Sequence, residues 1–251
     1  MTTSQPAADS GPGPDDAGAR PSPSISRRAL RDGVYDALLE KILDGSAPAG
    51  SSLTIDALAR ELAVSPTPVR EALVQMEHTG LVTREALKGY RVAPPMSREH
   101  LEQLFDMRLI LEPAAAARAM ARIEELLPEL RAAHARHEAA ADQVRRRLDE
   151  GRPTTGEGFA ELREYFTADW SFHLAIVHAS GNVFLQQSLD SLQTHVQRMR
   201  QTADHGRLDM DEAVAEHADV LAAFETREPT TVDDALRRHL HAVAGRVSSD
   251  G

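Results

Sequence analysis

The sequence predicts a mainly α-helical protein in two folded parts: a small N-terminal part with one strand pair, and a larger antiparallel helical bundle. Two observations predict this. Apolar residues recur at helical spacing from residue 27 almost to the C-terminus. Strand-like alternation is confined to one short segment, 81–92, and is absent beyond it. We expect a tail over 1–25, the small part over 26–95 and the bundle over 96–248.

Composition narrows the class of protein. The chain has 251 residues, 41% of them apolar, which is enough to bury a core. It has no cysteine, so disulfides, thiolate metal sites and cysteine nucleophiles are excluded. No apolar run is long enough to span a membrane, and the N-terminus lacks the pattern of a signal peptide. We therefore expect a cytoplasmic protein without a membrane partner.

The first 25 residues are dominated by Pro, Gly, Ser, Asp and Ala, a composition that favours disorder. The first helix follows. Leu30, Val34, Leu38 and Ile42 recur every four residues and form its apolar face, and Gly45 ends it.

The stretch "AVSPTPVREAL" (63–73) places two prolines in a helical pattern. A helix beginning at Thr54 ends before this stretch, and a second begins with Ser65 as N-cap. Pro66 and Pro68 then occupy its first and third positions, where backbone amides have no intrahelical partner. The prolines therefore mark a helix start. The buried stripe of the second helix is Val69, Ala72, Leu73 and Met76.

Two short helices joined so tightly are typical of a helix-turn-helix, whose second helix enters the major groove of DNA. The first turn of that helix meets base edges, which makes Ser65, Thr67 and Arg70 candidate DNA contacts. Residues 27–95 carry nine basic and nine acidic side chains, whereas the part beyond carries nine of the eleven net negative charges. DNA contact is therefore expected in the small part.

Segments 81–84 and 90–92 can pair as strands around "LKG", with Lys88 at the tip. This completes a winged helix-turn-helix. The alternative is a tight helical pair that only builds a core.

From residue 96 onward the pattern indicates six helices. Pro128 predicts a late start or a kink in the second, and Asn182 is a good N-cap for the fourth. The expected ranges are 97–121, 123–149, 158–179, 183–203, 209–227 and 231–247.

The segment from "LLEKILDG" to "KGYRV" resembles the N-terminal domain of the GntR family of bacterial transcription regulators. The remainder resembles the helical ligand domain of its FadR branch, called FCD, through "LFDMRLILEPAAAARA" (104–119), "DWSFHLAIVHASGN" (169–182), "EH" (216–217) and "RRHL" (237–240). These motifs occur in order and cover everything except the tail.

The resemblance implies a homodimeric, ligand-responsive regulator, expected to be a repressor, that binds a pseudo-palindromic operator in double-stranded DNA. It also implies a small carboxylate effector. One departure stands out: the family usually has an arginine after the N-cap serine, where this chain has Pro66. The chain is therefore expected to depend on Arg70, Thr67, Lys88 and the backbone for DNA contact.

Asp169 and His173 are four residues apart, so both lie on one face of a helix and could share a metal ion. Two ligands are insufficient, and a pair of this kind is more often a surface hydrogen bond. The resemblance supplies His217 and His239 as the other ligands. Three imidazoles and a carboxylate suit a divalent ion such as Zn²⁺ or Ni²⁺. The alternative is that these histidines are core residues bonded to carbonyl groups.

Five further histidines show no comparable pattern and are expected at the surface or in pocket walls: His134, His137, His178, His195 and His205. Arg108 heads an Arg-x3-Glu pair with Glu112. An exposed intrahelical ion pair contributes only about 0.3–0.5 kcal/mol, whereas the resemblance places Arg108 in the effector pocket, where a guanidinium can bind a carboxylate.

Two alternatives remain open at this point. The first is a metal-dependent helical enzyme, a hydrolase or isomerase, because three histidines and an aspartate can activate water. The second keeps the DNA-binding function but makes the metal a purely structural staple of the bundle.

Overall fold

The computed structural model describes Met1 and residues 27–86, 89–153, 158–199 and 209–249. Apart from Met1, the expected tail (1–25) lies outside these residues, and so do Lys88 and His205. The small part contains α1 (Arg27–Leu43), β1 (Ser52–Leu53), α2 (Ile55–Glu61), α3 (Pro66–His78), β2 (Val82–Glu85) and β3 (Gly89–Val92). The bundle contains α4 (Arg98–Ala119), the short 3₁₀ turn η1 (Met120–Arg122), α5 (Ile123–Asp149), α6 (Phe159–Ala179), α7 (Val183–Met199), α8 (Met210–Thr226) and α9 (Pro229–Ser249).

The helix-turn-helix forms as predicted. α3 begins at Pro66 with Pro68 in its first turn, and Ala63 in the preceding turn adopts a left-handed φ of 53°. Ser65 and Thr54 occupy the N-cap positions of α3 and α2, but neither side chain makes a capping hydrogen bond. The predicted stripe of α3 is fully buried and packs against α1 and α2.

The predicted strand pair is present, and a third strand joins it. The three-stranded antiparallel sheet has the order β1-β3-β2, with Val82 opposite Val92 and Glu85 opposite Gly89. The sequence did not predict β1, because two residues are too few to show alternation. The helix pair and this sheet together form a winged helix-turn-helix.

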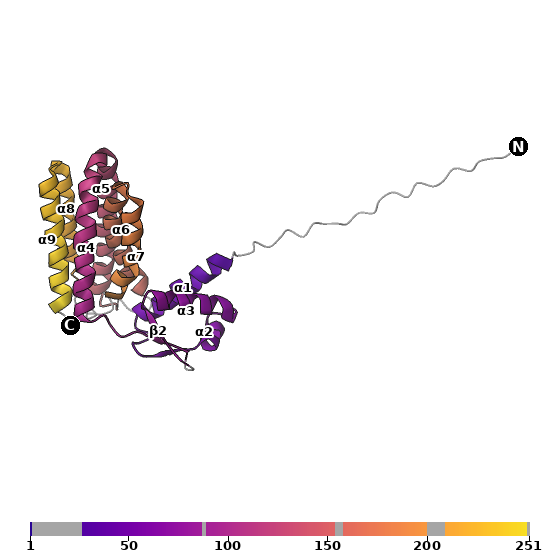
Figure 1. Cartoon of the computed structure of the whole chain (residues 1–251). Helices are drawn as coiled ribbons and strands as arrows, with labels where there is room; N and C mark the ends of the chain where they lie inside the picture. The colour runs from indigo at the N-terminus through magenta and orange to yellow at the C-terminus, as the bar shows by residue number, and fades with distance from the viewer. Residues whose placement is uncertain (2–26, 87–88, 154–157, 200–208, 250–251) are drawn as a thin grey trace.

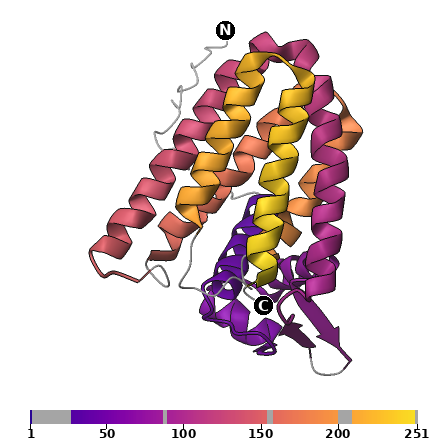
Figure 2. The same cartoon turned by 90° about the vertical axis from the view of Figure 1, so that its left-hand side faces the viewer.

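The bundle stands beside the winged part in Figures 1 and 2, and α4 begins at the end nearest to it. α4 packs against α6 and α9, and α5 packs against α6 and α8. The helices of both parts and the one small sheet confirm the predicted fold class, which is mainly α-helical.

Among the described residues, no helix is both long and apolar enough to cross a lipid bilayer.

Two prolines lie inside helices of the bundle. Pro128 falls in the second turn of α5, which runs through it from Ile123 to Asp149, so the expected range 123–149 is confirmed and the alternative of a later start is wrong. Pro113 in α4 has no N–H to offer the carbonyl of Leu109. That carbonyl accepts a hydrogen bond from Arg237 of α9 instead, at 3.4 Å. The absence of an N–H at Pro113 therefore leaves this carbonyl of α4 available for a hydrogen bond with α9.

Asn182 caps α7, as its sequence context predicts. Its Oδ1 accepts hydrogen bonds from the backbone N–H groups of Phe184 (3.0 Å) and Leu185 (3.3 Å). Gly181 before it has a φ of 63°, which glycine adopts without strain. The turn between α6 and α7 therefore holds α7 against the helix that carries Asp169 and His173.

Candidate metal and effector site, and the DNA-binding face

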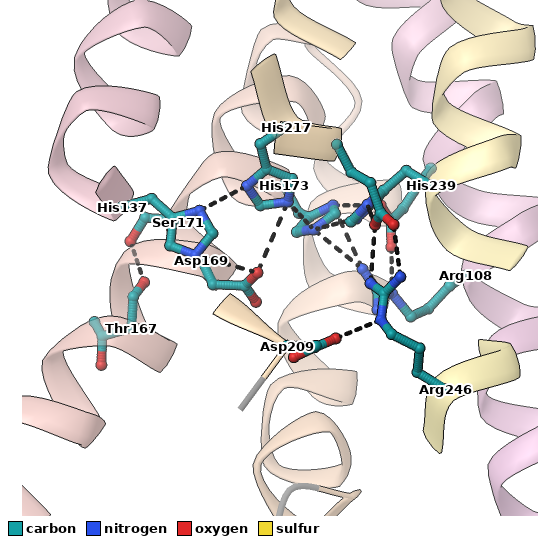
Figure 3. Close-up of polar contacts among 12 residues, drawn as sticks. Arg108, His137, Thr167, Asp169, Ser171, His173, Asp209, His217, His239 and Arg246 are labelled. Atoms are coloured by element: carbon teal, nitrogen blue, oxygen red, sulfur yellow. Dashed lines mark hydrogen bonds and ion pairs between the residues drawn. The ribbon is translucent and has the colours of Figure 1, made fainter. Parts of the chain in front are cut away.

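Three histidines from three helices converge inside the bundle (Figure 3). Nε2 of His173 on α6 lies 3.2 Å from Nε2 of His217 on α8 and 3.4 Å from Nε2 of His239 on α9. All three side chains are buried. Because these helices are distant in sequence, only the fold brings the three nitrogen atoms together.

Asp169 lies one turn before His173 on α6. Its Oδ1 is 3.7 Å from Nε2 of His217 and 3.8 Å from Nε2 of His137, a residue of α5. Two overlapping groups of potential ligands result: one of His173, His217 and His239, the other of His137, Asp169 and His217. All four residues predicted as ligands therefore lie together, with Asp169 on the His217 side.

Two carboxylates hold the imidazole rings of His173 and His239 in their orientations. Nδ1 of His173 lies 2.7 Å from Oε2 of Glu112, and Nδ1 of His239 lies 2.9 Å from Oε2 of Glu216. An ionised carboxylate accepts a hydrogen bond from Nδ1–H, so each contact places a ring proton on Nδ1. In the neutral ring this leaves the lone pair on Nε2, the nitrogen that faces the centre of the cluster.

Both carboxylates are held in the ionised form by basic neighbours. Burial alone would raise the pKa of Glu112, but Arg108 and His173 outweigh it and lower this pKa to about 2. Burial acts in the same way on Glu216, where hydrogen bonds from His239 and Arg246 lower the pKa to about 2. Arg246 also bonds Asp209 at 2.6 Å, and its own pKa is raised.

Burial favours the neutral form of two of the converging rings, those of His217 and His239. Burial, followed by the field of His239, lowers the pKa of His217 well below its ordinary value, and burial likewise lowers the pKa of His239. Unprotonated imidazole nitrogens that face one another direct their lone pairs at a common point, where a cation can bind. Ligands about 2.1 Å from a tetrahedral zinc ion lie about 3.4 Å apart, close to the separations seen here. The donor set could therefore hold a divalent metal.

Arg108 of α4 lies beside this cluster. Its Nε donates to Glu112 at 2.6 Å, and its Nη2 lies 3.3 Å from Nε2 of His173. The guanidinium sits near the rings of Phe105 and Trp170, whose centroids are 5.5 and 5.4 Å from Cζ. Arg108 is therefore a buried ion-pair partner that also reaches the edge of the candidate metal site.

The sequence did not predict the residues that support the ligands. Glu112 was assigned only to the ion pair, and Glu216 had no expected role. Of the two positions expected for His137, surface or pocket wall, the surface is wrong, because its side chain is fully buried against the cluster. One signal could have found it. His137 continues the buried stripe of α5, formed by Leu126, Leu130, Ala133, Ala140 and Val144.

The outer face of α3 carries the predicted DNA contacts. Ser65, Thr67 and Arg70 are all exposed on its first turns. Arg70 and Arg84 of β2 both line a hollow between α3 and the wing, together with Ile55, Val74, Glu85, Gly89 and Tyr90. Arg84 adds a basic side chain that the sequence did not single out.

A winged helix-turn-helix joined to a helical bundle with a buried polar site defines the class of ligand-responsive DNA-binding transcription regulators. Comparison with protein families agrees. Residues 30–92 match the model "Bacterial regulatory proteins, gntR family", and residues 103–242 match the FCD domain model. The chain belongs to the GntR family of transcription regulators and carries an FCD domain.

Relatives along most of the chain are transcription regulators. A protein of Paenarthrobacter nicotinovorans named "Probable D-xylose utilization operon transcriptional repressor" is 25% identical over 88% of this chain and 90% of its own length. The HTH-type transcriptional repressor GlaR of Escherichia coli is 29% identical over 82% of this chain and 90% of its own length. These relatives give no support to the alternative of a metal-dependent enzyme.

Solved structures share the fold. E. coli McbR/YncC superposes with a TM-score of 0.67 at 20% identity, covering 88% of this chain and 97% of that one. A GntR regulator from Rhodococcus sp. RHA1 gives a TM-score of 0.62 at 19% identity, covering 86% of this chain and 96% of that one. At such identities the likeness concerns the fold alone.

Proposed function

We propose that this regulator is a repressor that senses a small organic acid at a divalent metal held by Asp169, His173, His217 and His239. One observation carries the proposal: three imidazole Nε2 atoms converge in the buried core, with the Arg108 guanidinium 3.3 Å from one of them. Zn²⁺ and Ni²⁺ suit this donor set best.

The four side chains would hold the ion and leave coordination positions open. When bound, the ion would offer positive charge to a carboxylate. Arg108 has the complementary geometry for the same ligand, because its guanidinium can donate to a carboxylate from the edge of the cluster. The surrounding apolar and aromatic side chains exclude water, which strengthens both attractions.

The helices that would contact the effector are suited to pass on its binding. The ligands come from α6, α8 and α9, and Arg108 comes from α4. α4 begins six residues after β3 ends, so its position is tied directly to the wing. An effector that prefers one arrangement of these helices would shift the placement of the DNA-binding part, with a coupling free energy of typically ~1–3 kcal/mol.

On the DNA side, we propose that residues 26–95 form the DNA-binding domain and residues 96–248 the effector domain. Two copies in a homodimer would present two α3 helices to a pseudo-palindromic operator. Ser65, Thr67 and Arg70 would contact DNA from α3 and Lys88 from the wing. The exposure of the first three residues supports this assignment.

The test is the melting temperature of metal-loaded protein against a panel of small carboxylates, each with and without a chelator. A ligand that binds only the folded state raises the melting temperature. The proposal predicts stabilisation by one or a few acids that is lost on chelation. Stabilisation that survives chelation would instead make the metal a structural staple and leave Arg108 as the anchor. No stabilisation by any acid would contradict a carboxylate sensor.

A further inference from the structure

We propose that His137 is a positioning residue for the metal site: it accepts a hydrogen bond from the ring N–H of His217 and so holds that ligand with Nε2 free for the ion. This inference rests on the proposed metal site and assigns a role to a histidine that is not itself among the proposed ligands. Its basis is a contact of 3.0 Å between Nδ1 of His217 and Nδ1 of His137 (Figure 3).

The proton positions follow from the geometry. His217 turns Nε2 toward His173 and Asp169, at 3.2 and 3.7 Å, so this nitrogen must carry a lone pair when it binds a metal. The single proton of the neutral ring then sits on Nδ1. The side chain that faces Nδ1 at hydrogen-bond distance is His137, which must accept through its own Nδ1.

The second nitrogen of His137 is consistent with this assignment. A neutral ring that accepts through Nδ1 carries its proton on Nε2. Nε2 of His137 lies 3.8 Å from Oδ1 of Asp169, so a proton on this nitrogen has a carboxylate as its neighbour, beyond the length of a hydrogen bond. The ring is fully buried and packs against Tyr165, with centroids 4.9 Å apart, which keeps it in this orientation.

The three histidine ligands thus receive two kinds of support. His173 and His239 each donate to a carboxylate, Glu112 and Glu216, which in turn bonds an arginine. His217 donates to a neutral histidine. A third carboxylate at this place would lie next to Asp169 and be repelled by it, whereas an imidazole can accept from His217 and face Asp169 at once.

The test compares two nearly isosteric substitutions, His137→Asn and His137→Leu. Both remove the ring and its packing on Tyr165, but the Asn Oδ1 lies close to the position of the imidazole Nδ1 and can accept the same hydrogen bond. The control is His134→Leu, one turn earlier on α5, where the ring lies at the edge of Phe172 and outside both ligand groups. The readouts are the Zn²⁺ dissociation constant, from competition with a chelator, and the visible spectrum of Co²⁺-loaded protein.

Loss of an outer-shell partner typically weakens metal binding by about 10–100-fold. We expect a loss of this size for His137→Leu with a changed Co²⁺ spectrum, and near wild-type affinity and spectrum for His137→Asn and His134→Leu. Equal weakening in the Asn and Leu variants would overturn the proposal, because the effect would then be one of packing. Wild-type affinity in His137→Leu would overturn it as well.

Two further measurements keep the outcome interpretable. Urea unfolding of each metal-free variant, followed by the fluorescence of Trp170, reports whether the bundle still folds. If His137→Leu does not fold, His137→Met fills more of the space and takes its place. Wild-type protein that binds no Zn²⁺ would remove the proposed function and this inference together, whereas the Asn and Leu comparison tests His137 alone.

Discussion

The buried ion pair between Arg108 and Glu112 makes a quantitative prediction for Glu112→Gln. Folding lowers the pKa of Glu112 from 4.5 to about 2, which corresponds to roughly 3 kcal/mol of unfolding free energy at neutral pH. Leaving one partner of a buried pair alone typically costs about 3–5 kcal/mol. The amide keeps the shape but cannot accept from both Arg108 and His173. We therefore expect Glu112→Gln to lower the stability by about 3 kcal/mol.

The assay is urea unfolding of metal-free protein, followed by Trp170, the only tryptophan of the chain. α4 supplies a matched control at the same spacing: Arg98 and Glu102 pair at 3.0 Å but are exposed, so Glu102→Gln should change stability by under about 1 kcal/mol. The carboxylate of Glu112 stabilises fully above pH 4.5, and this contribution is lost as the pH falls toward 2. The difference between wild type and Glu112→Gln should shrink accordingly. Equal effects of the two substitutions at neutral pH would refute the argument.

Three further predictions concern other parts of the molecule. Arg70→Ala should weaken binding to a DNA duplex selected by the wild-type protein by roughly 1–3 kcal/mol, measured by fluorescence anisotropy at fixed salt. The control Arg122→Ala, in the bundle, should leave DNA binding unchanged. Equal binding by the two variants would remove Arg70 from the interface. Asn182→Ala should cost about 1 kcal/mol in urea unfolding and Asn182→Asp much less, because only the acceptor caps α7; no loss in Asn182→Ala would contradict the capping role. Burial keeps His217 and His239 neutral in the folded state, whereas the unfolded chain takes up protons on them below pH 6.5. The stability of metal-free protein should therefore fall between about pH 7 and pH 5, by up to about 1.4 kcal/mol per pH unit for each histidine, and a constant urea midpoint over this range would argue against neutral buried rings.

The features that were predicted correctly are those determined by residues close together in the sequence. The stripe of Val69, Ala72, Leu73 and Met76 and the prolines at the start of α3 determine a helix and its buried face within a few residues. Asn182 caps α7 through hydrogen bonds from the backbone N–H groups two and three residues further along. The range 123–149 was predicted correctly even though it contains Pro128, because a proline in the second turn leaves most of the helix's hydrogen bonds intact.

The support of the site could not be predicted in the same way. Glu216 is adjacent to His217 in sequence but bonds His239 of α9. His137 meets His217 across 80 positions of the chain. Such contacts depend on how α5, α8 and α9 pack, and no spacing along a single helix encodes them. The resemblance supplied the four candidate ligands because it carries information about the fold, whereas residue periodicity supplied only the pair of Asp169 and His173.

The most direct test of the central claim is elemental analysis of the purified protein together with its His239→Ala variant. His239 is one of three converging imidazoles, and its removal leaves two imidazoles and one carboxylate to hold the ion, which weakens metal binding. The account predicts about one divalent ion per chain in the wild type, little or none in His239→Ala, and a folded winged part in both. Equal metal content in the two proteins, or none in the wild type, would contradict it.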